Sequence, residues 1–164
     1  MALSELIPKI DDIIHHKDVL LEEKLVQICH VLNDNVDYYD WVGFYFVNGD
    51  KPELLLGPYV GESTEHTVIP FGKGICGQVA VSNETFIVPD VSAQDNYIAC
   101  SITVKSEIVV PIFANGKNIG QIDIDSHIPD AFNEMDQQFL EDICAKISRL
   151  FEDSGSTSTK EELA

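Results

Sequence analysis

The sequence is short of positive charge. Lys and Arg together number 10 against 28 Asp and Glu, which gives a formal net charge of −18 over 164 residues. Binding to DNA or RNA, or docking on anionic membranes, requires a cationic surface, so we expect neither kind of partner. The acidic balance favours a cationic or zwitterionic small ligand, although an acidic surface also serves solubility alone.

Long apolar runs are missing too. No stretch approaches the length of a transmembrane helix, and the start MALSELIPKIDDIIHH lacks the features of a signal peptide. We therefore expect a cytoplasmic protein whose four cysteines are thiols rather than a disulfide framework. No Cys-x-x-Cys pair is present, which argues against a zinc knuckle or a thioredoxin motif.

What is present fits one globular domain. Apolar residues make up 45% of the chain, which is typical of a protein with a packed core. We expect residues 1–153 to form a single domain. The tail 154–164, SGSTSTKEELA, has nothing to bury and is expected to be disordered.

Apolar residues at helical spacing predict helices at both ends of the chain. A short helix is expected over 3–14, and a longer one, capped by Asp18, should run to about Val36. Asn133, with Asp136 three residues later, predicts a capped final helix.

Between the end helices, the pattern changes to strands. Strands are expected over 41–47, 53–60, 68–70 and 84–91, with a hairpin over 105–126 and a short helix at about 75–82. Neighbouring strands joined by short turns imply a mainly antiparallel sheet. The end helices should cover its apolar face, which leaves the loops and the other face to form a pocket.

The hairpin turns at Asn115-Gly116, and the length of its loop decides which side chains share a face. A two-residue loop would pair Glu107 with Ile124 and mix acidic and apolar side chains on both faces. A three-residue loop, with Ala114 included, would pair Glu107 with Asp123 instead. Because a shift of one residue moves every side chain to the other face, we predict the three-residue loop.

That register gathers Glu107, Asp123 and Asp125 on one face and the isoleucines on the other. Like charges opposite each other destabilise a sheet, so three carboxylates on one face require a reason. They either form a binding site or cover a solvated outer face, and the pattern alone leaves both readings open.

Two cysteines are candidates for chemistry. Cys76 follows closely spaced glycines in FGKGICG and should lie in the first turn of the short helix, where the helix dipole lowers a thiol pKa, unless it is a packing residue. Cys100 lies in an irregular loop segment, where a functional role is as plausible as a structural one. Cys29 and Cys144 fall in amphipathic helices and are expected in the core.

Several segments together resemble the free methionine-(R)-sulfoxide reductases, which are single GAF domains. The segments are WVGFY (41–45), LGPY (56–59), FGKGICG (71–77), IVPDV (87–91), IAC (98–100), SEIVVP (106–111) and DIDS (123–126). The resemblance implies an α+β fold with a central six-stranded antiparallel sheet, the N- and C-terminal helices on one face and a ligand pocket on the other.

The resemblance also implies an oxidoreductase mechanism without a bound cofactor. Cys100 would be the nucleophile, and the acids Glu107, Asp123 and Asp125 would bind the substrate or protonate its oxygen. The cysteine would be left as a sulfenic acid, with electrons finally from thioredoxin or a small thiol. Trp41 and Tyr45 would wall the methyl-sulfoxide end of the ligand or serve as core aromatics.

The sequence departs from the family pattern at two places. The family's resolving cysteine has no counterpart in Gly61–Thr67, and Ser101 replaces the usual Asp after the nucleophile. Cys76 or an external thiol would then have to resolve the sulfenic acid. The alternative is a non-catalytic GAF module that binds a small zwitterion. The oligomeric state, with a homodimer as one alternative, is left open.

Overall fold

The computed structural model describes residues 2–94 and 103–153, so Cys100, Ser101 and the tail 154–164 lie outside the described residues. The helices are a 3-10 turn at Leu3–Leu6, α1 (Ile7–His15), α2 (Leu21–Asn35), α3 (Gly74–Ser82), a 3-10 turn at Val91–Ala93, and α4 (Glu134–Asp153). The strands are β1 (Trp41–Val47), β2 (Glu53–Val60), β3 (Val68–Pro70), β4 (Phe86–Val88), β5 (Ser106–Ala114) and β6 (Lys117–Ser126).

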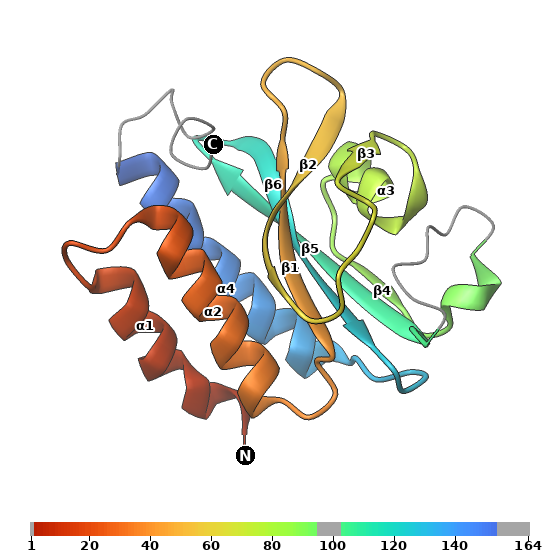
Figure 1. The fold of residues 1–164 in the computed structure, drawn as a ribbon, viewed down its shortest axis with the longest axis horizontal. Helices are drawn as coiled ribbons and strands as arrows, with labels where there is room; N and C mark the ends of the chain where they lie inside the picture. The colour runs from red at the N-terminus through yellow and green to blue at the C-terminus, as the bar shows by residue number, and fades with distance from the viewer. Residues whose placement is uncertain (1, 95–102, 154–164) are drawn as a thin grey trace.

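The six strands form one antiparallel sheet in the order β3-β2-β1-β6-β5-β4 (Figure 1). The prediction of a six-stranded antiparallel sheet is therefore confirmed. The fourth strand is shorter than expected: β4 covers Phe86–Val88 rather than 84–91, and it pairs with the first half of β5 alone.

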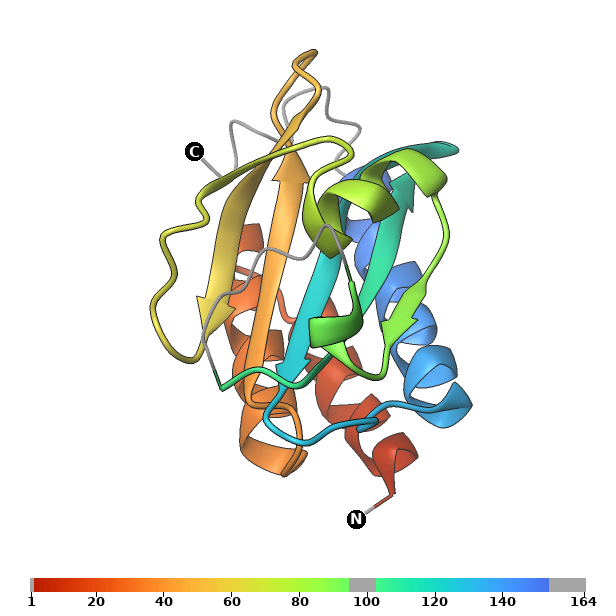
Figure 2. The same ribbon diagram turned by 90° about the vertical axis from the view of Figure 1, so that its right-hand side faces the viewer.

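The two faces of the sheet are covered differently, as Figures 1 and 2 show. Helices α1, α2 and α4 lie on one face, where side chains such as Phe44, Ile108 and Ile124 form the larger core. Helix α3 and the loops lie on the other face, over a smaller core that includes Trp41 and Tyr45. The expected arrangement, end helices on one face and a pocket-forming layer on the other, is confirmed.

The start of α2 differs from the prediction. Asp18 does not cap the helix; it adopts the left-handed conformation, with φ of 66°, in the turn before it. The N-cap residue is Leu20, whose side chain makes no capping hydrogen bond. Asp18 therefore serves the turn between α1 and α2, a role that short polar side chains perform because they tolerate positive φ.

The predicted cap of α4 is confirmed. Asn133 Oδ1 accepts hydrogen bonds from the backbone N–H groups of Met135 and Asp136, and Asp136 Oδ2 accepts one from the N–H of Asn133. The buried Asp136 also accepts hydrogen bonds from the hydroxyls of Tyr38 and Tyr39, each at 2.7 Å. One carboxylate thus joins the start of α4 to the segment that precedes β1.

The turn of the β5–β6 hairpin differs from the predicted one. The loop contains two residues, Asn115 and Gly116, both with positive φ (53° and 78°), and Ala114 pairs with Lys117. This is the geometry of a type I′ turn. The predicted three-residue loop is therefore wrong.

The acids nevertheless share a face, because β6 contains a bulge. Ile112 pairs with Gly120 and the next residue, Phe113, with Asn118, so Ile119 is an extra residue on β6. The bulge moves the register by one residue, and Glu107 pairs with Asp125 rather than with Asp123. The predicted pairing is wrong, whereas the predicted separation of acidic and apolar faces is correct.

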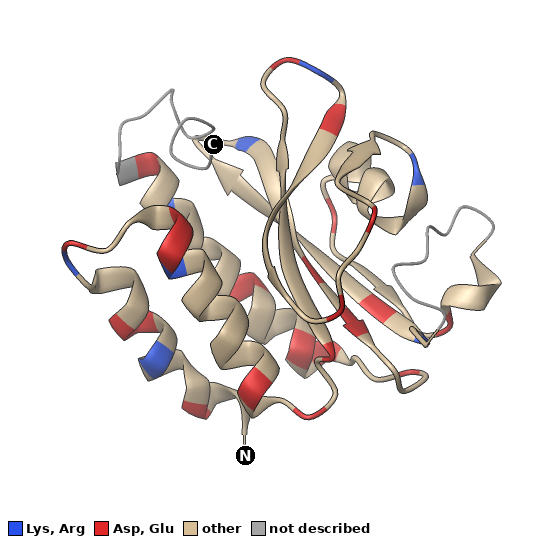
Figure 3. Ribbon diagram, viewed as in Figure 1, with Lys and Arg blue, Asp and Glu red and all other residues tan. Residues whose placement is uncertain are grey.

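The acidic residues are spread over helices, strands and loops rather than gathered in one patch (Figure 3). Among the described residues, no helix is both long enough and apolar enough to cross a membrane.

Candidate functional site

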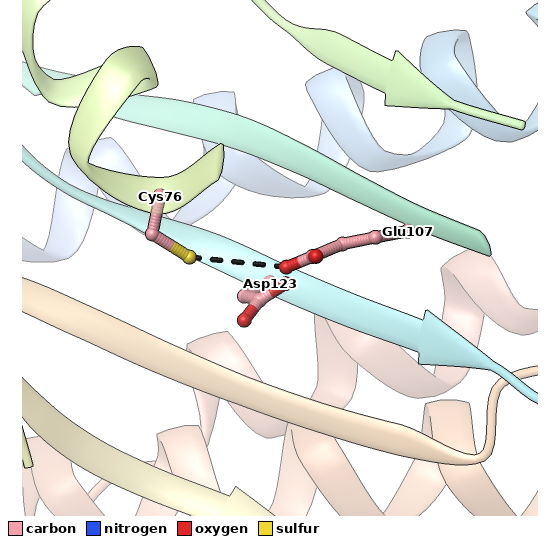
Figure 4. A group of neighbouring side chains, drawn as sticks. All are labelled: Cys76, Glu107 and Asp123. Atoms are coloured by element: carbon pink, nitrogen blue, oxygen red, sulfur yellow. Dashed lines mark hydrogen bonds between the residues drawn. The ribbon is translucent and has the colours of Figure 1, made fainter. Parts of the chain in front are cut away.

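Three reactive side chains from three elements meet on the loop-covered face of the sheet. Cys76 belongs to α3, Glu107 to β5 and Asp123 to β6, and all three are at least 94% buried. Their sulfur and carboxylate oxygens lie within 4.8 Å of one another and point toward a common centre (Figure 4). The Cys76 thiol donates a hydrogen bond to Glu107 Oε2 at 3.9 Å.

The sheet and α3 fix these groups from two sides. Glu107 and Asp123 alternate with core residues along β5 and β6, so their side chains leave the sheet on the face opposite the larger core. Gln121, buried on the same face of β6, donates from Nε2 to the carbonyl oxygen of Cys76 at 3.1 Å. This hydrogen bond anchors the first turn of α3 over the carboxylates.

The glycines before Cys76 allow α3 to start close to the sheet. Gly72 and Gly74 have positive φ, 85° and 61°. A Cβ on Gly77 would lie 2.6 Å from the carbonyl oxygen of Pro70, which real side chains do not tolerate. Both readings of the glycine-rich stretch, a tight turn and a close backbone approach, are therefore correct.

The electrostatics of Cys76 contradict the expectation of an activated thiol. Burial raises the pKa of Cys76 well above its ordinary value, and the carboxylates of Asp123 and Glu107 raise it further. Cys76 is therefore a protonated thiol in this environment.

Asp123 also favours its protonated form. Burial raises the pKa of its carboxyl group above the ordinary value, and hydrogen bonds with Glu107 and Cys76 oppose part of that rise. Asp123 Oδ1 is buried and has no hydrogen-bond partner among the residues that the structure describes. Asp123 can therefore donate a proton when it is protonated, and its Oδ1 can accept a hydrogen bond from a ligand.

Asp125 lies two residues further along β6 on the same face. It is 1% exposed and pairs with Trp41 of β1 and Glu107 of β5. Its negative charge also contributes to the raised pKa of Cys76. The face therefore contains all three predicted acids, two of which, Glu107 and Asp123, line the cavity beside Cys76.

The two predicted aromatic residues have different positions. Tyr45 lines the cavity, and its hydroxyl donates to the carbonyl oxygen of His66 at 2.9 Å. Trp41 stacks on Tyr59, with ring centroids 5.3 Å apart, and donates from Nε1 to the carbonyl oxygen of Glu62. Both side chains therefore donate hydrogen bonds to the backbone of the loop between β2 and β3. Trp41 is not among the residues that line the cavity.

Sequence reasoning missed the two basic side chains that line the cavity, His66 and Lys73. Both lie in polar loop segments whose composition gives no sign of what they face. The cavity itself is small, about 10 Å³, which is roughly the space that one water molecule needs. Any larger ligand requires movement of the segments that line it.

Cys29 and Cys144 lie in the larger core, on the opposite face of the sheet from Cys76. Burial raises the pKa of both thiols above their ordinary values. The prediction that these two cysteines are core residues is confirmed.

A larger groove, about 710 Å³, lies between α4 and the end of β5. Two carboxylates, Glu84 and Glu141, line it, and Glu141 accepts hydrogen bonds from Thr85 and Gln137. Within the described part of the chain, this groove brings together no cluster of ionisable groups comparable with Cys76, Glu107 and Asp123. We therefore place the candidate site at the smaller cavity.

The sheet order, the helices on one face and the covered cavity on the other define the chain as a GAF domain, and the GAF domain family model matches residues 20–152. The free methionine-R-sulfoxide reductase of Escherichia coli is 33% identical over 126 residues, 77% of this chain and 74% of that protein. The chain therefore belongs to the free methionine-R-sulfoxide reductase family.

Two further relatives agree with this assignment. The free methionine-R-sulfoxide reductase of Saccharomyces cerevisiae is 44% identical over 112 residues, which span 67% of this chain and 62% of the yeast protein. The X-ray structure of the enzyme from Neisseria meningitidis, in complex with its substrate, superposes with a TM-score of 0.85. It is 36% identical, and the match covers 91% of this chain and 87% of that one.

Proposed function

We propose that this chain reduces free L-methionine-(R)-sulfoxide to L-methionine. The observation that carries the proposal is the buried pair Glu107 and Asp123, facing one cavity beside a thiol in a member of this family. The relatives in Escherichia coli and Saccharomyces cerevisiae are named for this reaction. We further propose that the protein works in the cytoplasm.

The proposed reaction transfers oxygen from the substrate to Cys100. The sulfur of Cys100 attacks the sulfoxide sulfur, and a carboxyl group donates a proton to the sulfoxide oxygen. The products are methionine and a sulfenic acid on Cys100, so the substrate sulfur is reduced and the cysteine sulfur is oxidised. Asp123, whose pKa is raised by burial, is suited to supply the proton.

The other acids are suited to the ammonium group of the substrate. A charged amino group gains short, charge-assisted hydrogen bonds from buried carboxylates. Glu107 and Asp125 are assigned this role because they pair across β5 and β6 on the face of the cavity. Tyr45 and the methylene groups of Lys73 would then border the rest of the ligand.

The sulfenic acid is resolved by a second thiol. An external thiol attacks the Cys100 sulfur, water leaves, and a further thiol releases the mixed disulfide as reduced enzyme. We prefer this route, with thioredoxin or a small thiol as donor, because the raised pKa of Cys76 weakens it as an internal nucleophile. Cys76 is the internal alternative.

Turnover of free methionine-(R)-sulfoxide with dithiothreitol tests the reaction. Exposure to one equivalent of substrate, alkylation and mass spectrometry then identify the oxidised cysteine. A trappable sulfenic acid on Cys100, with full dithiothreitol-driven turnover in Cys76→Ser, supports the external route. A Cys76–Cys100 disulfide in high yield would assign the step to Cys76, and no oxidation of Cys100 would end the enzyme proposal.

A second candidate function is a non-catalytic module that binds a small zwitterion. The absence of a cysteine in Gly61–Thr67 and the presence of Ser101 favour it, because both differ from the family's pattern. The same substrate experiment separates the two. Saturable binding of methionine sulfoxide without consumption would establish the binding module.

A further inference from the structure

We propose that Cys76, Glu107 and Asp123 form a binding site for one zinc ion. The three side chains offer one sulfur and two carboxylate oxygens within 4.8 Å of one another. Each comes from a different element, and the sheet and the Gln121 hydrogen bond hold those elements together. The three residues are far apart in the sequence and meet only in the folded chain, so no sequence motif indicates the site.

An unpartnered oxygen points to a ligand at this position. Asp123 is 1% exposed, and its Oδ1 accepts no hydrogen bond from any residue that the structure describes. A buried carboxylate oxygen without a donor is costly unless a cation or a water molecule approaches it. The cavity beside it, about 10 Å³, has the size for an ion or a single water molecule.

The distances suit zinc after a small contraction. Zinc–sulfur bonds of about 2.3 Å and zinc–oxygen bonds of about 2.1 Å, in a tetrahedral arrangement, place neighbouring ligand atoms roughly 3.4–3.6 Å apart. Cys76 Sγ and Glu107 Oε2 are already 3.9 Å apart. The separations within the group are at most 4.8 Å, so binding requires the ligand atoms to approach one another by roughly 1 Å.

The donor set selects zinc over harder cations. Magnesium and calcium prefer sites built from oxygen atoms alone, whereas a thiolate favours zinc among the common divalent ions. His66 lines the same cavity but is not one of the three residues whose ligand atoms lie within 4.8 Å of one another. A water molecule would therefore supply the fourth ligand. Zinc has no redox chemistry of its own, so coordination would leave the sulfur oxidation state unchanged.

Binding replaces protons by a metal ion. The Cys76 thiol and the Asp123 carboxyl group lose their protons to solvent, and the thiolate sulfur and the carboxylate oxygens bond to zinc. Two carboxylates and one thiolate then surround a divalent cation, whose charge stabilises all three groups in their ionised forms.

Zinc would also occupy the carboxylates proposed to serve the substrate. If the proposed function is correct, zinc inhibits turnover by competing with methionine sulfoxide. This consequence rests on the proposed function, whereas binding of the metal does not.

Equilibrium dialysis of the full chain against zinc chloride, with the metal measured by mass spectrometry, tests the binding. We expect one zinc per chain, with affinity at least about tenfold weaker in Cys76→Ser and in Asp123→Asn, since each loses a ligand. Cys144→Ser removes a buried thiol from the other face of the sheet and should bind zinc like the unchanged chain. Circular dichroism is the control that each variant is folded.

Cobalt(II) provides an independent readout of the ligands. The unchanged chain and Cys144→Ser should give a thiolate-to-metal charge-transfer band, and Cys76→Ser should lack it. Less than one zinc per two chains, or equal zinc affinity in Cys76→Ser and the unchanged chain, would overturn the proposal. Loss of binding in Cys144→Ser alone would do the same. These outcomes are independent of catalysis, so they stand even if the chain shows no reductase activity.

Discussion

At the scale of single residues, the site depends on buried carboxylates, because Glu107, Asp123 and Asp125 are each at most 4% exposed. Buried acids of this kind change their pKa rather than remain fully charged. Asp123 illustrates this, because its raised pKa has burial as the largest cause. Two predictions follow from these side chains.

The first concerns Glu107→Gln, which keeps the size of the side chain and removes its charge. If Glu107 holds the substrate's ammonium group, kcat/KM for methionine sulfoxide should fall by about 100-fold. Glu65→Gln, in the exposed loop, is the matched control and should retain full activity. Steady-state kinetics measure both, and equal losses would place the site elsewhere.

The second concerns the pH dependence of stability in Asp123→Asn. The folded-state pKa of Asp123 is raised above the ordinary 3.8, so its contribution to stability is complete below that value and is lost as pH rises through the folded pKa. Asn cannot ionise, so the variant should become more stable relative to the unchanged chain as pH rises. Urea unfolding at a series of pH values measures the difference. A difference that is independent of pH would contradict the burial argument.

Part of the site was predictable from sequence at this scale. The alternation of acidic and apolar residues indicated that Glu107 and Asp123 share a face, because alternation is a local property of a strand. The protonation of Cys76 was not predictable in the same way. It depends on carboxylates from β5 and β6, which are distant in sequence from α3.

At the scale of elements, the hairpin β5–β6 contains two features that compensate for each other. The two-residue turn alone would put acids and core residues on the wrong faces, and the bulge at Ile119 restores their separation. The sequence analysis placed one extra residue in the loop, whereas the protein places it in β6. Pattern reasoning identified the faces correctly because both solutions satisfy the same alternation, and for that reason it could not choose between them.

Deletion of single residues from β6 tests the bulge. Deletion of Ile119 should preserve the pairing of Glu107 with Asp125 and cost about 1–2 kcal/mol of stability. Deletion of Gly120 shortens the strand equally but places Ile119 opposite Phe46, where a Cβ would lie 2.3 Å from the Tyr45 carbonyl oxygen. That variant should lose more stability, by at least about 2 kcal/mol.

Urea unfolding compares the two deletions, and thiol labelling of Cys76 reports whether α3 still covers the site. Equal stability of both variants would mean that the register, rather than the space at Gly120, limits the strand.

At the scale of the whole molecule, α1 lies before the region that the GAF family model matches, which begins at residue 20. Its side chains Ile10 and Ile14 are nonetheless buried in the larger core, and Lys146 of α4 pairs with Asp11 at 2.9 Å. The helix is therefore packed into the same core as α2 and α4. The family match alone would place the start of the domain at residue 20, after α1.

Ile10→Ala tests this boundary. The side chain is fully buried, so its truncation should cost about 2–4 kcal/mol. Asp12→Ala, on the exposed side of α1, is the control and should change stability by less than about 0.5 kcal/mol. Chemical denaturation measures both, and a negligible effect of Ile10→Ala would show that α1 is an appendage.

The enclosed acidic cavity also predicts which substrates the molecule accepts. A free amino group can pair with buried carboxylates, whereas an acetylated one has no charge to offer them. We expect N-acetyl-methionine sulfoxide to react at least about 100-fold more slowly than the free amino acid. Competition assays with equal concentrations measure the ratio, and comparable rates would refute recognition through the amino group.

The central position of β1 also matters while the chain is being synthesised. β2 leaves the ribosome directly after β1 and can pair with one of its edges, but β6, which pairs with the other edge, is the last strand to be made. Until then the aromatic strand WVGFYFV has an unpaired edge, the kind of surface that recruits chaperones or aggregates. The C-terminal hairpin, which supplies both carboxylates of the cavity, is thus also the segment that protects the nascent N-terminal half from misassembly.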